Sequence, residues 1–220
     1  NSTETNIRYY TDDHLKKILN ISFLNRNNLK ISKIAKLSDE ELKRRVSELT
    51  DVDIAFEDQL DALVLSILEL DRFNFNKILD QHIELLGFEQ TMKEMIFPLM
   101  DKLSIMWMAG SLKSVQESFV TTCVKSKIII ANEKLPFNKN EPKASVMIFL
   151  PKNENHELSL LYLDFLLKYR NYAVINLGTE ISSDEVIDGL KLCQAKYVFT
   201  IINDSFAGGG LQEYIDEILR

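Results

Sequence analysis

Apolar residues recur at helical spacing over most of the first 134 positions of the chain. The spacing predicts a helix after an N-cap at Thr11, a short helix over 31–37 and a further helix opened by a capping box at Ser38. Four more helices are predicted across 52–134, the third of them bent or restarted at Pro98. Short connections between these four helices favour a bundle of about 80 residues.

The pattern changes after a proline-containing segment at 135–143, which is typical of a linker. Beyond it, short apolar runs alternate with helical patterns, and this alternation predicts a parallel sheet with right-handed crossovers. The predicted strands are 146–150, 172–176 and 197–202, and the predicted helices are 156–169, 182–194 and 211–219.

The predicted fold class is therefore all-α followed by α/β. It comprises a helical N-terminal segment at 1–50, a four-helix bundle at 51–137 and a Rossmann-like, flavodoxin-like domain at 143–220. Three βα units make a narrow sheet, whereas complete sheets of this kind have about five strands. We therefore expect the α/β domain to be truncated at its C-terminal end.

Charge is distributed unevenly along the chain. Of the 220 residues 45% are apolar and 27% are charged, a balance that supports a folded core, and the formal charge of −7 argues against nucleic-acid binding by the whole chain. Residues 1–50 hold ten Lys and Arg against seven Asp and Glu, a net +3, whereas residues 51–220 hold 16 against 26, a net −10. The basic surplus lies in the N-terminal segment, and this chain alone is expected to bind DNA weakly or not at all.

Cysteine content and hydropathy bear on the cellular compartment. Two cysteines, Cys123 and Cys193, cannot form a disulfide framework, which favours a reducing, cytoplasmic compartment. The sequence has no run of about 18 apolar residues, so no membrane span is expected.

Ligands of an open parallel sheet bind at the carboxyl ends of its strands, so the loops there are the candidate sites. They are 151–155, 177–181 and 203–210, and the first leads into Glu154-Asn155-His156. No GxGxxG or phosphate-loop lysine motif is present, the three histidines lack zinc spacing, and no Ser-His-Asp set is recognisable. The sequence indicates binding rather than catalysis, and no enzyme activity is expected.

Helices followed by a parallel α/β domain, with Glu-x-His after its first strand, resemble a cobalamin-binding module. In that family the loop reads Asp/Glu-x-His-x-x-Gly; Glu154 and His156 match, and Ser159 replaces the glycine. The resemblance implies a cobalamin between bundle and α/β domain, with His156 as the lower axial ligand to cobalt and Glu154 orienting its ring. It also implies that Gly178 and Ser205 line the groove for the nucleotide tail of the cofactor.

A second motif is the spacing of Trp107 and Glu117. Sensors of this family carry a Trp in the bundle, followed after nine residues by Glu-His, facing the upper side of the cofactor. Here Ser118 replaces that histidine, and Met108 stands where light-sensing members tend to have another. The resemblance implies that Trp107 and Glu117 cover the upper face of the cofactor without an upper histidine ligand.

The N-terminal segment resembles the second half of a MerR-type winged helix. Arg8 and Tyr9 precede an amphipathic helix, and in that family the Arg-Tyr pair lies in the wing and contacts DNA phosphates. The helix-turn-helix half that reads DNA bases is missing from this sequence. The combined resemblance implies a MerR-type transcriptional regulator, similar to cobalamin-dependent light-responsive repressors. Such a regulator binds DNA through the N-terminal domain of the full-length protein and forms homo-oligomers, dimers or tetramers.

Plainer interpretations stay open for each motif. His156 also fits a surface or helix-capping histidine, Trp107 a core residue, Glu117 a solvated position, and Arg8 with Tyr9 an ordinary turn before a helix. Two other functions fit as well. One is a degenerate sensor that no longer binds cobalamin and acts through protein or other small-molecule contacts; the other is a corrinoid carrier protein of a methyltransferase system.

Overall fold

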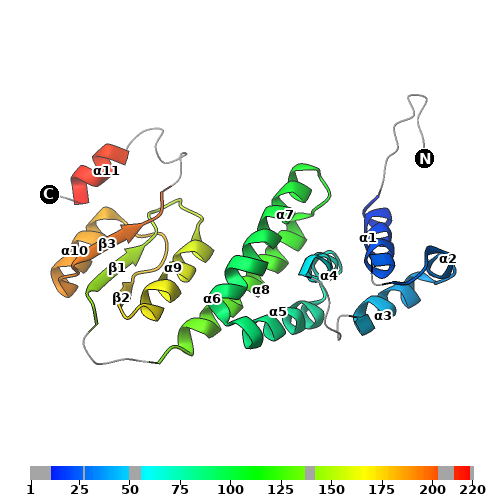
Figure 1. Cartoon of the computed structure of the whole chain (residues 1–220). Helices are drawn as coiled ribbons and strands as arrows, with labels where there is room; N and C mark the ends of the chain where they lie inside the picture. Colours follow the sequence, from blue (N-terminus) through cyan, green and yellow to red (C-terminus); the bar gives the residue numbers. More distant parts are fainter. Residues whose placement is uncertain (1–10, 27, 50–55, 137–141, 203–210, 219–220) are drawn as a thin grey trace, which may run out of the picture. The chain divides into compact units, whose positions relative to one another are not determined.

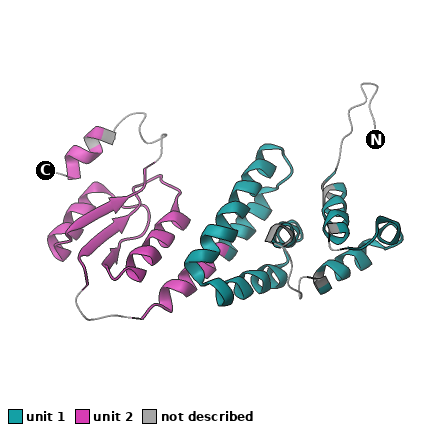
Figure 2. Ribbon diagram, in the orientation of Figure 1, with its two compact units in different colours: residues 1–123 teal, residues 124–220 magenta. Residues whose placement is uncertain are grey.

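The structure is a computed structural model that describes residues 11–26, 28–49, 56–136, 142–202 and 211–218 (Figure 1). Its elements group into two units, Asn1–Cys123 and Val124–Arg220, coloured separately in Figure 2. The division falls within one long helix, α8 (Ser114–Glu133). The predicted domain bounds of 1–50, 51–137 and 143–220 stay predictions.

The first unit begins with helices α1 (Asp12–Arg26), α2 (Ile31–Ile34) and α3 (Asp39–Leu49). The predicted N-cap at Thr11 is confirmed, because its Oγ1 accepts the backbone N–H of His14 at 3.3 Å. A reciprocal hydrogen bond joins the same two residues, since Nδ1 of the His14 ring accepts the N–H of Thr11 at 3.2 Å. The capping box is confirmed too, with the N–H of Ser38 donating to the carboxylate of Glu41 at 2.8 Å.

Helix α4 (Phe56–Leu68) is the central helix of the first unit, because every residue from 61 to 68 is buried. A turn leads from it to α5 (Arg72–Leu86), and the carboxylate of Asp71 caps α5 by accepting the N–H of Asn74 at 3.1 Å. Gly87 ends α5 with a φ of 81°, a conformation that glycine adopts without steric cost. Aspartate and glycine are residue types that commonly occupy these two capping positions.

The segment after Gly87 is one unbroken helical stretch of α6 (Phe88–Thr91), the π-turn η1 (Met92–Ile96) and α7 (Phe97–Met108). The irregularity predicted at Pro98 takes the form of this π-turn, which ends two residues before the proline, and Pro98 lies in the first turn of α7. Proline has no N–H to donate to the carbonyl four residues earlier, and a local change to π pairing accommodates that loss.

The second unit is a three-stranded parallel sheet with strand order β2-β1-β3. The strands are β1 (Ser145–Phe149), β2 (Ala173–Asn176) and β3 (Tyr197–Thr200), and the helices between and after them are α9 (Glu157–Tyr169), α10 (Ser183–Cys193) and α11 (Leu211–Ile218). A capping box at Ser182 opens α10, and its hydrogen bonds to Glu185 lower the pKa of that carboxyl group. The predicted fold class, helices followed by a parallel α/β unit, is confirmed.

Helices cover both faces of the sheet (Figure 1). Side chains of β1 alternate between the two cores, as a strand requires. Val146, Ile148 and Leu150 pack with Leu160 of α9 on one face. On the other face Met147 and Phe149 pack with Val186 of α10, together with residues of α11. In the described ranges, no helix has the length and apolar character that crossing a membrane requires.

Buried His82 makes the first unit sensitive to acid. Its Nε2 contacts Gln59 of α4, and burial lowers its pKa, with Glu94 opposing part of that shift. The folded state therefore favours the neutral ring, and this contribution to stability is complete above pH 6.5 and is lost as the pH falls towards the lowered pKa. We expect urea unfolding at pH 7.5 and 5.5 to show a smaller loss of stability on acidification in His82→Gln than in the wild type. An equal loss in both proteins would contradict this assignment.

Candidate functional site

The strand order places a candidate site at the carboxyl ends of β1 and β3. Helix α9 carries the chain from β1 to β2 over one face of the sheet, and α10 carries it from β2 to β3 over the other. The helix that follows β1, α9, packs on one face of the sheet and the next helix after β3, α11, packs on the other. This arrangement is typical of a switch point, where open α/β sheets bind ligands. The loop that leaves β1 there, residues 150–156 (the β1 loop), contains both Glu154 and His156.

Glu154 and His156 are paired. The Glu154 side chain is 1% exposed, that of His156 is 39% exposed, and Nδ1 of His156 lies 3.1 Å from Oε2 of Glu154. An ionised carboxylate only accepts hydrogen bonds, so the ring donates through Nδ1–H, and Nε2 is the nitrogen that remains for a ligand. This is the arrangement in which a carboxylate orients a metal-binding imidazole.

His156 does not act as a helix cap. It occupies the N-cap position of α9, but its side chain makes no capping hydrogen bond, and only its backbone carbonyl accepts the N–H of Leu160 at 3.0 Å. The capping interpretation of this histidine is therefore wrong. Its half-exposed ring is directed by Glu154 instead.

The loop after β2, residues 177–181 (the β2 loop), lies against the β1 loop. The N–H of Leu150 donates to the carbonyl of Gly178 at 2.9 Å, and the N–H of Ile181 donates to the carbonyl of Leu150 at 3.0 Å. Further along, Oε1 of Glu180 accepts the N–H of Asn153 at 3.3 Å. The structure thus brings predicted residue Gly178 and the pair Glu154–His156 into adjoining loops.

Gly178 itself adopts a φ of 88°, and its N–H donates to Oδ1 of Asn176 at 2.9 Å. A Cβ added at this position would meet no atom within 4 Å. The surface at Gly178 is therefore open, as a residue that lines a groove requires, although its backbone conformation by itself also favours glycine.

Trp107 and Glu117 belong to the first unit. Trp107 lies at the end of α7 and is 45% exposed, so the interpretation as a core residue is wrong, and Glu117 is exposed in the first turn of α8. Other large apolar side chains near the turn between these helices are also exposed: Ile105, Met108 and Val115. Exposed apolar residues gathered at one turn are typical of a binding surface.

Three predicted residues lie outside the described ranges: Arg8 and Tyr9 of the proposed wing, and Ser205 after β3. Among the residues that are described, no group of three His, Cys, Asp or Glu side chains could enclose a metal ion. A single axial histidine does not require such a group.

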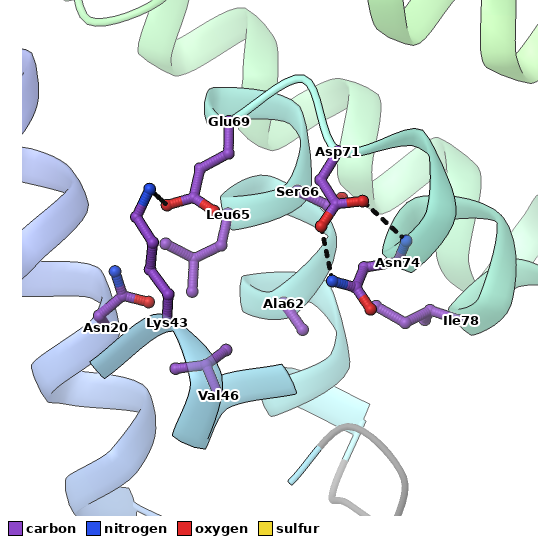
Figure 3. A pocket seen from close by; sticks show the side chains of 10 residues that line it. All are labelled: Asn20, Lys43, Val46, Ala62, Leu65, Ser66, Glu69, Asp71, Asn74 and Ile78. Carbon is purple, nitrogen blue, oxygen red and sulfur yellow. Dashed lines mark hydrogen bonds and ion pairs between the residues drawn. The ribbon is translucent and has the colours of Figure 1, made fainter. Parts of the chain in front are cut away.

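A small cavity of about 30 Å³ in the first unit is separate from all these residues (Figure 3). Helices α1, α3, α4 and α5 line it, and its polar wall includes Glu69, which forms an ion pair with Lys43 at 3.0 Å. The volume suits one or two water molecules rather than a cofactor.

Sequence reasoning missed two residues that hold the β1 loop and its surroundings. One is Glu180, described above; the other is Lys125 of α8, whose Nζ lies 2.6 Å from Oε1 of Glu157, the first residue of α9. Both contacts join residues far apart in sequence, and neither has a local motif. The sequence does indicate the positive φ of Asn153 (69°), because asparagine tolerates that conformation in turns.

Comparison with known proteins gives little beyond the geometry. No family model matches the chain, and no curated protein matches it. A similar solved structure is the methanol:cobalamin methyltransferase complex MtaBC from Methanosarcina barkeri, which is 15% identical, with 96% of this chain and 75% of that chain covered and a TM-score of 0.36. Values this low do not establish a common fold, so the fold assignment rests on the helices and strands described above.

Proposed function

We propose that the α/β unit binds a cobalamin, with His156 as the lower axial ligand to cobalt. The observation that carries this proposal is the buried Glu154 carboxylate hydrogen-bonded to Nδ1 of a half-exposed His156 at the sheet's switch point. The pair leaves Nε2 for the metal, and imidazole nitrogen is a ligand that suits transition metals of this kind.

The remaining predicted residues fit this cofactor by their chemistry. Gly178 presents an open surface where a nucleotide tail could pass close to the backbone. In our proposal the exposed indole of Trp107 and the carboxylate of Glu117 cover the upper face of the corrin ring. A cobalamin bound there would supply a cobalt ion that exchanges its axial ligands, the residues of this chain would bind and orient the cofactor, and we propose no enzyme activity for the chain.

The test is reconstitution of the full chain with hydroxocobalamin, followed by its visible absorption spectrum. The wild type is expected to retain the corrinoid after gel filtration with the spectrum of an imidazole-ligated cobalt. His156→Ala should lose that spectrum, and Glu154→Gln should weaken binding roughly ten- to a hundredfold, the usual effect of removing a carboxylate that orients a metal ligand. The exposed His14→Ala is the matched control and should behave as the wild type.

A wild-type protein that stays colourless, or a His156→Ala variant that keeps the spectrum, would contradict cobalamin ligation by His156. A colourless wild type would instead support the degenerate sensor that acts through other contacts.

A bound cobalamin fits either a transcriptional regulator or a corrinoid carrier, and the N-terminal segment favours the regulator. Residues 1–50 carry a net charge of +3, and the apolar spacing of this segment predicts helices where α1, α2 and α3 lie. We therefore propose a cytoplasmic, homo-oligomeric transcriptional regulator over a corrinoid carrier of a methyltransferase system. A gel shift of the full-length protein on its own promoter at low salt should show binding, whereas a carrier should show none.

A further inference from the structure

We infer that Glu180 is a positioning residue for His156, acting through the backbone of the β1 loop rather than on the ring itself. This inference rests on the proposed function of His156. Its basis is the hydrogen bond from the N–H of Asn153 to Oε1 of Glu180 at 3.3 Å, which joins the β2 loop to the residue before Glu154.

The contact fixes the type of turn that precedes the Glu154–His156 pair. The N–H of Glu154 donates to the carbonyl of Pro151 at 3.2 Å and closes a β-turn, and Asn153 at its third position has a φ of 69°. An ordinary φ at Lys152 followed by a positive φ at Asn153 is the geometry of a type II turn. Types I and II differ in the orientation of the peptide between these two residues, and that peptide carries the N–H that Glu180 accepts.

The hydrogen bond also anchors the backbone directly before Glu154. Glu154 is the last residue of the turn, and its carboxylate is buried while it accepts Nδ1–H of His156. Without the bond to Glu180, the backbone at Asn153 has more freedom to move, and the buried carboxylate one residue later moves with it. Glu180 therefore acts on the imidazole through two links, first the turn and then the Glu154 side chain.

Both residues of this contact have left-handed backbone conformations. Glu180 has a φ of 61° and Asn153 a φ of 69°, and left-handed conformations of this kind cost free energy in residues other than glycine. They persist where surrounding contacts over-determine them. The backbone hydrogen bonds of Leu150 fix only the beginning of the β1 loop. The Glu180 carboxylate also fixes Asn153, the residue next to Glu154, by accepting its N–H.

The experiment compares Glu180→Gln with Glu180→Met in the full chain. Both side chains have similar length and both meet the same strained backbone, but only the glutamine amide keeps an oxygen that accepts the N–H of Asn153. The exposed Asp184→Ala, close by in the first turn of α10, serves as the control for a change of surface charge.

Two measurements are made on each variant. Nitrogen-15 chemical shifts of the His156 ring, in protein without corrinoid, report which ring nitrogen carries the proton. The dissociation constant for hydroxocobalamin reports binding. Glu180→Met should mix the two tautomers and weaken binding about threefold, as expected for one exposed hydrogen bond to a charged group, whereas Glu180→Gln should stay close to the wild type.

The outcomes separate this inference from the proposed function. If Glu180→Met leaves both the tautomer and the dissociation constant unchanged, or if Glu180→Gln is as impaired as Glu180→Met, Glu180 is not a positioning residue. If the wild type binds no hydroxocobalamin but the tautomer responds to Glu180→Met and not to Glu180→Gln, the positioning of His156 stands and the cobalamin proposal falls.

Discussion

Replacing Phe75 by alanine is expected to lower the free energy of unfolding of the first unit by about 3–5 kcal/mol. The side chain is fully buried in α5, and its ring meets that of Phe119 edge-on, with centroids 6.2 Å apart and an interplanar angle of 74°. Alanine would remove the ring from a packed core and leave a cavity that the surrounding helices can close only in part.

Urea unfolding followed by tryptophan fluorescence measures this effect in the correct unit, because the chain has one tryptophan, Trp107, and it lies in α7. The matched control is Phe73→Ala on the same helix. That ring is 75% exposed, so its removal should change the stability by less than about 0.5 kcal/mol. Similar losses in the two variants would show that packing around α5 differs from the structure described here.

The parts of the fold that sequence predicted correctly are those decided by neighbouring residues. The caps at Thr11 and Ser38 follow from one side chain and the N–H group three positions later. The strands follow from runs that are apolar on both faces, and each begins and ends within two residues of its predicted bounds. The π-turn before Pro98 was not predicted, because its form depends on the packing of the whole helical stretch.

The candidate site likewise has a local part that the sequence predicts and a long-range part that it does not. Glu154 and His156 are two residues apart, so their pairing is local and the motif predicts it. Glu180 reaches the β1 loop from a segment 27 residues later, and Lys125 reaches Glu157 over 32 residues, through contacts that only the folded chain brings about. Sequence patterns at a strand end can therefore indicate a ligand, while the residues that position it depend on tertiary packing.

The second large effect is expected from Lys102→Met, because it leaves the carboxylate of Asp61 without its lysine partner inside the first unit. Asp61 lies on the enclosed helix α4, its side chain is 5% exposed, and Nζ of Lys102 on α7 forms an ion pair with its Oδ1. Breaking a buried pair costs more than the pair contributes, since one charge stays desolvated. Because Lys102 is 38% exposed, water can approach the site, and we expect a loss of about 2–4 kcal/mol.

The control is Lys93→Met, which breaks an exposed pair with Glu89 at 2.7 Å and should cost no more than about 0.5 kcal/mol. A double variant, Lys102→Met with Asp61→Leu, separates a desolvated charge from lost packing. If the charge is the cause, the double variant regains a substantial part of the stability that Lys102→Met loses, because no charge is left buried. The opposite result is that Asp61→Leu lowers the stability by the same amount in the Lys102→Met variant as in the wild type. The two residues would then act independently, and apolar contacts rather than this pair would hold α4 and α7 together.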